Sequence, residues 1–174
     1  MKLAALDGRD RIVVKLPLTR DGIAAAKILG RGGTGNGLGA RLCMTTCYNK
    51  EQAFVSAALG AEYVAPYLGR MSEAPSSKAV KKHNGYPSSL PCVDGVQECA
   101  AMVRVIKGMG ASTRVLVASL RSAGQLTALA EAGCDTFTFS PAIADELLYE
   151  PLTTIAAADF ETAAVVAGGA PVVW

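Results

Sequence analysis

The chain has 174 residues, of which 51% are hydrophobic, and its formal net charge is +2. This composition excludes a disordered chain and a nucleic-acid-binding arm, because those classes carry fewer apolar residues or a strong excess of one charge. The apolar stretch at residues 155–174 contains charges, glycines and a proline, so it does not predict a membrane span. The first ten residues lack the apolar core of a secretory signal. We therefore expect a soluble globular protein.

Short apolar strands alternate with helices along the chain. In chain order we predict strands at 11–18, 41–46, 62–68, 113–119 and 135–140, and helices at 22–29, 50–59, 96–109, 123–131, 143–150 and 154–166. Thr19 is expected to cap the first helix, and Asp21 lies near the positive end of that helix. Strands this short and this apolar predict a parallel sheet covered by helices. The sheet could be doubly wound or could be part of a (β/α)₈ barrel.

A repeated Ala-Gly motif favours the barrel. At residues 58–64 and 131–137, a glycine closes a helix and a strand begins two or three residues later. Connections this short are typical of TIM barrels. We therefore predict that residues 1–174 form a single, incomplete domain of the TIM-barrel type, with about five of the eight β-α units.

Lys15 is the only charged residue in the apolar run at residues 12–18. A lysine inside a buried strand is costly unless its amine is neutral, paired or used in chemistry. A desolvated amine has a lowered pKa and can form a Schiff base with a carbonyl. The alternative is a lysine near the strand end whose amine reaches solvent. The chemical interpretation requires an amine shielded from water, with arginines facing it across a shared cavity.

Two segments interrupt the alternation. Residues 30–35 match GxGxxG, but they follow a helix and precede a strand, whereas a dinucleotide site needs glycines that open a helix. We interpret residues 30–39 as a flexible loop on the non-catalytic side. Residues 72–94 contain three prolines with serines and lysines, and predict an extended surface loop that acts as a lid or contacts a partner.

The five cysteines form no CxxC pair, and only one histidine is present, His83 in a polar segment. We therefore predict no structural zinc site and no metal or other cofactor. An odd number of cysteines in a chain of ordinary core composition favours free thiols in a reducing compartment. The cysteines are Cys43, Cys47, Cys92, Cys99 and Cys134.

Polar residues cluster at the predicted carboxyl ends of the strands, which converge on one mouth in a parallel barrel. They are Thr45, Tyr67, Arg70, Ser119 and Arg121. Ser119 and Arg121 lead into a helix amino terminus, where backbone N–H groups favour an anion. Because a guanidinium binds two phosphate oxygens at once, Arg121, with Arg70 from the neighbouring strand, favours a phosphate site. A surface or ion-pair role is the alternative for each arginine singly.

Four segments carry a resemblance to a known family. They read VVKLPLT at 13–19, ALGAEYVAPYLGR at 58–70, VASLR at 117–121 and AGCD at 132–135. Together they resemble the transaldolase and fructose-6-phosphate aldolase family. The resemblance implies a (β/α)₈ barrel in which Lys15 forms a Schiff base with a dihydroxyacetone unit. By the same match, Thr45 lies beside the Schiff base, and Arg70, Ser119 and Arg121 bind the substrate phosphate.

The position of Tyr67 matches the water-positioning tyrosine of the aldolase branch, whereas transferases usually carry phenylalanine there. Ala65 also matches the aldolases. The chain departs from the family before Lys15, where members carry three more β-α units with a general-acid aspartate and a Thr-Asn-Pro motif. Cys43 takes the place of an asparagine found in the transferases. The chain therefore resembles an N-terminally shortened member.

Five strands do not close an eight-stranded barrel, and an open sheet exposes its edges. We therefore expect a homo-oligomer or a partner chain that covers those edges. Two functions remain open. One is Schiff-base cleavage or transfer of a dihydroxyacetone unit of a sugar phosphate, and the other is a catalytically impaired chain that serves as a structural or interaction subunit. A deoxyribose-phosphate aldolase fits the chemistry but not the motif at residues 65–70.

Overall fold

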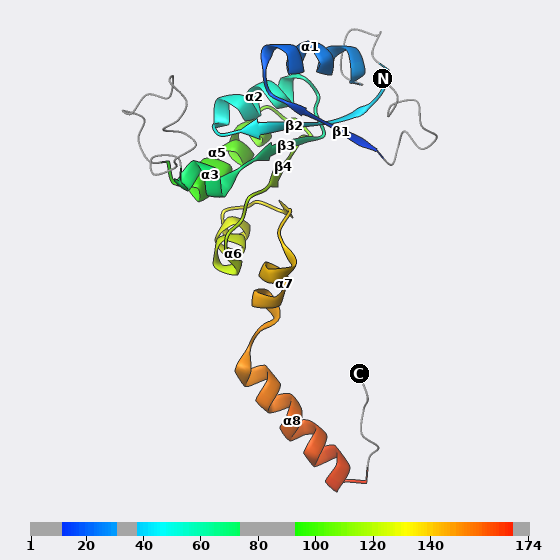
Figure 1. Ribbon diagram of the computed structural model, residues 1–174, viewed down its shortest axis with the longest axis vertical. Coiled ribbons are helices and arrows are strands. Elements are labelled where there is room, and N and C mark those ends of the chain that lie inside the picture. The colour runs from blue at the N-terminus through cyan, green and yellow to red at the C-terminus, as the bar shows by residue number, and fades with distance from the viewer. Residues whose placement is uncertain (1–11, 31–37, 74–92, 169–174) are drawn as a thin grey trace. The chain divides into compact units, whose positions relative to one another are not determined.

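The computed structural model describes residues 12–30, 38–73 and 93–168 (Figure 1). It divides into two compact units, Met1–Phe139 and Ser140–Trp174, which are described separately. The single domain predicted over residues 1–174 stays a prediction. Within the described ranges, no helix is long and apolar enough to cross a membrane.

The first unit contains a five-stranded parallel sheet whose strands follow one another in chain order. The strands are β1 (Val13–Pro17), β2 (Arg41–Cys47), β3 (Tyr63–Pro66), β4 (Arg114–Val117) and β5 (Thr136–Phe137). A doubly wound sheet reverses its strand order at a switch point, and this sheet does not. Because parallel crossovers are right-handed, a monotonic order places the connecting helices on one face. The predicted α/β fold is confirmed, and the arrangement is that of part of a TIM-type barrel.

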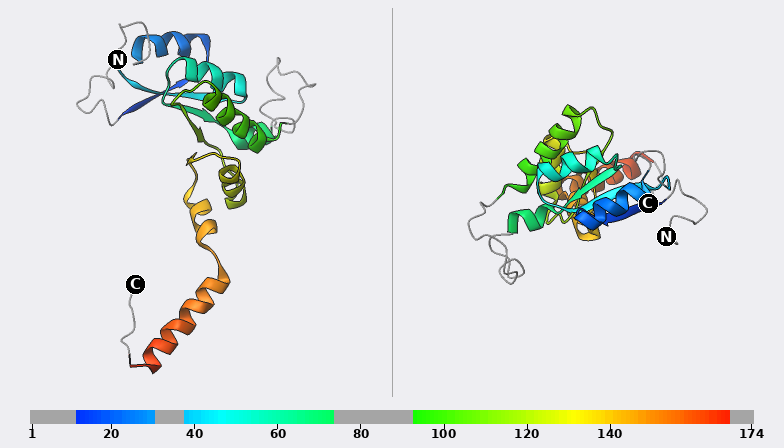
Figure 2. Two further views of the ribbon diagram at one scale, coloured as in Figure 1. Left: turned by 180° about the vertical axis from the view of Figure 1, so that it is seen from behind. Right: turned by 90° about the horizontal axis from the view of Figure 1, so that it is seen from above.

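Five described helices belong to this unit, namely α1 (Arg20–Leu29), α2 (Lys50–Ala58), α3 (Leu68–Glu73), α5 (Gly95–Gly108) and α6 (Ala123–Glu131). Figures 1 and 2 show α1 and α2 on the same side of β1 and β2. The predicted cap of α1 is confirmed, because the Thr19 hydroxyl accepts the Gly22 N–H at 3.1 Å. Gly60 and Gly133 adopt φ values of +68° and +90° after α2 and α6, which confirms the predicted short connections.

The helices cover one face of the sheet, and the hydrophobic core lies between the helices and that face. Leu42 and Met44 of β2 are buried in a cluster with small residues of α1 and the strand starts, and Val14 and Leu16 pack against it. Since side chains alternate along a strand, Lys15 and Thr45 belong to the opposite face, which we call the front face.

A β-bulge interrupts this alternation near the end of β2. Thr45 is aligned with Ala65 and Cys47 with Pro66, so Thr46 is one residue too many for its partner strand. Thr46 has a φ of +58°. The extra residue leaves Thr45 on the front face and returns Cys47 to the helix side.

Several predicted boundaries are wrong. The predicted strand at 62–68 ends earlier, and α3 occupies the end of that segment and the start of the predicted loop at 72–94. Asp94 caps α5 by accepting the N–H groups of Val96 and Gln97. Residues 74–92, including His83, lie outside the described residues, as do residues 31–37 of the glycine-rich segment. The predicted order of that segment, after a helix and before a strand, is confirmed.

The second unit consists of α7 (Pro141–Leu148) and α8 (Pro151–Val166). Both helices begin earlier than predicted, because each proline occupies the first helical turn, where a missing N–H breaks no hydrogen bond. Figure 2 shows α8 as one continuous helix. No residue of α8 is buried, and several of its large apolar side chains are exposed, namely Leu152, Ile155, Phe160, Val165 and Val166.

Candidate active site

The aromatic ring of Tyr67 lies at the centre of the predicted catalytic residues. Tyr67 directly follows β3 and forms an isolated parallel bridge with Ala118. The Thr45 hydroxyl donates a hydrogen bond to the phenolic oxygen of Tyr67 at 3.1 Å. The ring of Tyr48 packs edge-on against the Tyr67 ring, with 6.1 Å between centroids and 83° between planes. The phenol is therefore held from two sides.

Two cationic side chains border the same ring. The Nζ atom of Lys15 lies 5.9 Å from the ring centroid of Tyr67, and the Cζ atom of Arg70 lies 4.9 Å from it. Both distances fall within the range in which an aromatic ring attracts a cation. The structure thus brings four predicted residues together, and we call Lys15, Thr45, Tyr67 and Arg70 the Tyr67 cluster.

The predicted shielding of Lys15 from water is wrong for this structure. No residue of β1 is buried, and Lys15 is exposed. The physical reason is that β1 pairs only with β2 among the described strands, so its front face has a neighbour on one side only. The alternative in which the amine reaches solvent describes the observed position.

Cys43 is the direct neighbour of Lys15 in the register between β1 and β2. Burial raises the pKa of the Cys43 thiol, and the positive charge of Lys15 works in the opposite direction. The thiol therefore stays protonated at neutral pH beside the amine. Cys43 therefore places no negative charge beside the Lys15 amine.

The loop after β4 carries the two remaining predicted residues. Leu68 N–H donates to the Ala118 carbonyl and Gly69 N–H donates to the Ser119 carbonyl, each at 3.0 Å. Ser119 adopts a φ of +64°, in the left-handed region that a serine rarely occupies. These hydrogen bonds hold the loop against the start of α3, next to Arg70.

Arg121 does not border the Tyr67 ring but pairs with Glu73 of α3. Its Nε atom donates to Glu73 Oε1 at 2.9 Å, and its Nη2 atom donates to Glu73 Oε2 at 3.4 Å. These bonds lower the pKa of Glu73 and raise the pKa of Arg121, so both groups are charged at neutral pH. Arg70 and Arg121, two of the predicted phosphate ligands, thus lie on adjoining segments but have different contacts. Arg70 borders the Tyr67 ring, and Arg121 is paired with the Glu73 carboxylate.

The sequence predictions missed Tyr48 and Glu73. Glu73 stands three residues after Arg70, a spacing that makes two side chains neighbours on a helix. A predicted helix at residues 68–73 would therefore have placed Glu73 beside Arg70. Tyr48 left no such signal, because its face depends on the bulge at Thr46.

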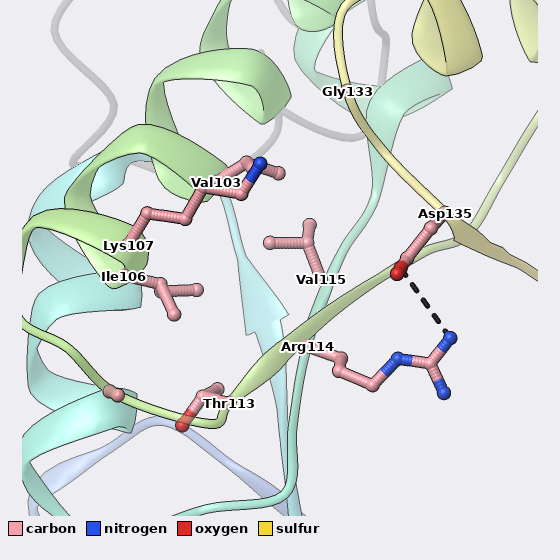
Figure 3. Close-up of a pocket in the computed structure, with 9 residues that line it drawn as sticks. Val103, Ile106, Lys107, Thr113, Arg114, Val115, Gly133 and Asp135 are labelled. Carbon is pink, nitrogen blue, oxygen red and sulfur yellow. Dashed lines mark ion pairs between the residues drawn. The ribbon is translucent and has the colours of Figure 1, made fainter.

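A separate hollow lies at the amino ends of the strands (Figure 3). It is bordered by an ion pair between Arg114 and Asp135, whose Nη2 and Oδ1 atoms are 3.5 Å apart. Its lining includes Val103, Ile106, Lys107, Thr113 and Gly133, and none of the predicted catalytic or phosphate-binding residues. Since the catalytic side of a parallel barrel is at the carboxyl ends of its strands, this hollow is not the candidate site.

The cysteines and acidic residues offer no metal centre within residues 12–30, 38–73 and 93–168, where no group of three or more potential ligands occurs. Cys43, Cys47, Cys99 and Cys134 are free and buried. Burial raises the pKa of Cys47 to about 12 and that of Cys134 to about 11, so these thiols are poor nucleophiles at neutral pH.

Comparison with known sequences adds a family relationship. The sequence model of the family described as Transaldolase/Fructose-6-phosphate aldolase matches residues 1–168. A protein named "Probable transaldolase" from Anaeromyxobacter sp. (strain K) is 30% identical over 82% of this chain and 55% of its own length. A protein of the same name from Chelativorans sp. (strain BNC1) is 28% identical over 83% of this chain and 56% of its own length. The chain thus spans about half the length of these curated relatives.

A solved structure shares the fold. A crystal structure of a GMP reductase from Trypanosoma brucei aligns with a TM-score of 0.50 at 18% identity, covering 80% of this chain and 35% of that one. At this identity the likeness concerns the fold alone.

Proposed function

Because the chain belongs to the transaldolase/fructose-6-phosphate aldolase family, we propose that it cleaves or transfers a dihydroxyacetone unit of a sugar phosphate through an imine on Lys15. The observation that carries this proposal is the Tyr67 cluster, in which the Lys15 amine and the Arg70 guanidinium border one phenol that is hydrogen-bonded to Thr45. An amine, a proton-relaying hydroxyl pair and a cation are what this reaction requires of the protein.

The reaction begins when the Lys15 amine attacks the substrate's keto carbon. The carbonyl oxygen leaves as water, and a protonated imine remains. Loss of a proton from the hydroxyl on the second carbon from the imine carbon turns that hydroxyl into the carbonyl of an aldehyde. The bond between that carbon and the carbon next to the imine breaks, and the bonding electrons move toward the imine to form an enamine. An aldehyde departs. The enamine is then protonated and hydrolysed, or attacks another aldehyde.

The other residues of the site are assigned roles by their positions. Tyr67 positions the water that carries the proton, and Thr45 orients the Tyr67 hydroxyl through their 3.1 Å hydrogen bond. Arg70, Ser119 and Arg121 hold the phosphate, and the two arginines supply the charge-assisted hydrogen bonds that phosphate favours. These residues come from β2, from α3 and from the loop after β4, so the site depends on the packing of the first unit.

A second candidate function follows from the exposure of Lys15. An exposed amine lacks the water-excluding surroundings that strengthen electrostatic catalysis. This observation favours a catalytically impaired chain that acts as a structural or interaction subunit. We further propose that such a chain works in a reducing compartment, in agreement with its free cysteines.

Covalent trapping distinguishes the two functions. The purified chain is incubated with dihydroxyacetone or with fructose 6-phosphate, reduced with borohydride and analysed by intact-mass spectrometry and peptide mapping. The enzyme function predicts a stable adduct on Lys15 with either compound. No adduct with either compound would support the subunit function.

Replacing Tyr67 with phenylalanine separates imine formation from proton transfer. Tyr67→Phe keeps the ring beside Lys15 and Arg70 but removes the hydroxyl that contacts Thr45. We expect the trapped adduct to persist while release of the aldehyde product slows by about 10²- to 10⁴-fold, the usual contribution of general acid–base catalysis. Tyr149→Phe, at an exposed position in the second unit, is the matched control. An unchanged rate of aldehyde release in Tyr67→Phe would exclude the proposed role of its hydroxyl.

We also propose that the chain associates, either with itself or with a partner that covers the sheet edges. The exposed apolar side chains of α8 support this proposal, because removing them from water would stabilise an assembly. Light scattering after size-exclusion chromatography should give a mass at least twice that of one chain. Replacing Leu152 and Phe160 with serine should lower that mass if α8 contributes, and a wild-type monomer would contradict self-association.

A further inference from the structure

Arg121 and Glu73 form a two-point ion pair at the proposed phosphate site. Two nitrogens of the guanidinium donate to two oxygens of the carboxylate, at 2.9 and 3.4 Å. The pair is half exposed, with 51% of the Arg121 side chain and 50% of the Glu73 side chain accessible. Solvent and solutes therefore reach it directly.

The backbone brings these two side chains together. Arg121 lies against Gly69, where an added Cβ would be 3.0 Å from the Arg121 Cζ atom. Gly69 in turn donates its N–H to the Ser119 carbonyl at 3.0 Å. Glu73 stands one helical turn after Arg70 on α3, so its carboxylate extends from the same short helix that carries the other proposed phosphate ligand.

A carboxylate and a phosphate bind a guanidinium in the same way, through two parallel N–H···O hydrogen bonds. The Nε and Nη2 groups that Glu73 occupies are therefore groups that a phosphate would use. Both anions also repel each other when they lie at one cation. We infer that Glu73 competes with the substrate's phosphate group for Arg121, so that phosphorylated substrates displace this carboxylate when they bind.

This inference rests on the proposed function for the role of Arg121, and it adds a determinant of substrate affinity. A substrate that carries a phosphate can form hydrogen bonds with Arg121 only after the ion pair between Arg121 and Glu73 is broken. A substrate without a phosphate leaves the pair intact. Glu73 is thus a specificity-determining residue that lowers the affinity for phosphate without touching the reacting carbon atoms.

Phosphate affinity tests the competition directly. Inorganic phosphate is titrated into the full chain by calorimetry, with Glu73→Gln, Glu131→Gln and the double variant Glu73→Gln/Arg121→Gln alongside the wild type. Glu131 is an exposed residue of α6 and provides the same charge change away from the pair. We expect Glu73→Gln to bind phosphate roughly two- to fivefold more tightly, as for the loss of one exposed ion pair, and Glu131→Gln to match the wild type. The double variant should not show this increase in phosphate affinity, because it lacks the Arg121 guanidinium.

Borohydride trapping provides the second readout. At subsaturating fructose 6-phosphate, Glu73→Gln should increase the fraction of trapped Lys15, whereas trapping with dihydroxyacetone should not change. If the wild type is trapped but Glu73→Gln binds phosphate no better, the competition is refuted and the proposed function stands. If no variant is trapped but Glu73→Gln still binds phosphate more tightly, the competition stands and the Schiff-base function fails.

Discussion

Replacing Lys15 with methionine is expected to abolish the borohydride adduct completely. An imine requires a primary amine, and methionine has a similar length without that amine. Lys15 is exposed on β1, so the substitution removes no buried contact, and the free energy of unfolding should change by no more than about 0.5 kcal/mol. Intact-mass spectrometry after reduction with dihydroxyacetone measures the adduct, and circular dichroism confirms the fold.

Lys27→Met is the matched control for this experiment. Lys27 is an exposed lysine in the last turn of α1, remote in sequence from every residue of the Tyr67 cluster. This variant should be trapped to the same extent as the wild type. An adduct that persists in Lys15→Met and maps to another lysine would overturn the assignment of Lys15 as the Schiff-base residue.

Replacing Gly69 with alanine should damage both the fold and the phosphate site. The added Cβ would lie 2.5 Å from the Ser119 carbonyl oxygen and 3.0 Å from the Arg121 guanidinium carbon. Because the closer atom belongs to the backbone, the loop after β4 must move away from α3. The hydrogen bond from Gly69 N–H to the Ser119 carbonyl weakens as a result. We expect a loss of about 1–3 kcal/mol in the free energy of unfolding, as for other overpacked sites.

Denaturant unfolding measures the loss in stability, and phosphate titration measures the effect on the site. Gly124→Ala is the matched control, since the nearest atom to an added Cβ there is the Ser122 hydroxyl at 3.9 Å. As a helical glycine of α6, Gly124 should tolerate alanine with equal or slightly greater stability. A Gly69→Ala variant as stable as the wild type would show that the contact between α3 and the loop is easily rearranged.

The sequence contained most of the information about the fold because its local signals agreed with one another. Thr19, Gly60 and Gly133 marked helix ends, and the short apolar runs marked the strands of a parallel sheet. The short helix α3 was missed because it occupies the end of an apolar run that began as a strand. The predicted helix starts at residues 143 and 154 fall after the prolines that open α7 and α8, because the apolar pattern used to place them begins only after the first turn.

The sequence indicated which residues belong to the candidate site better than it indicated their exposure and their contacts. Polar residues at strand ends converge in any parallel sheet, which is why Thr45, Tyr67 and Arg70 could be grouped beforehand, and the family resemblance added Lys15 to them. The exposure of Lys15 could not be predicted from its neighbours in sequence, because burial depends on which strands flank β1. Likewise, the partner of Arg121 is set by the docking of a loop onto α3, which no local pattern encodes.

The β-bulge at Thr46 also decides which side chain lies beside the phenol of Tyr67. Past the bulge, Cys47 turns toward Ser56 of α2, and Tyr48 comes to face Tyr67 edge-on. If Thr46 were instead paired as an ordinary strand residue, the alternation would invert, so that the Cys47 thiol would lie on the front face where the Tyr48 ring now lies. The aromatic neighbour of Tyr67 thus depends on the bulge as well as on residue type, and pairing all of β2 regularly would remove that neighbour without changing any residue of the Tyr67 cluster.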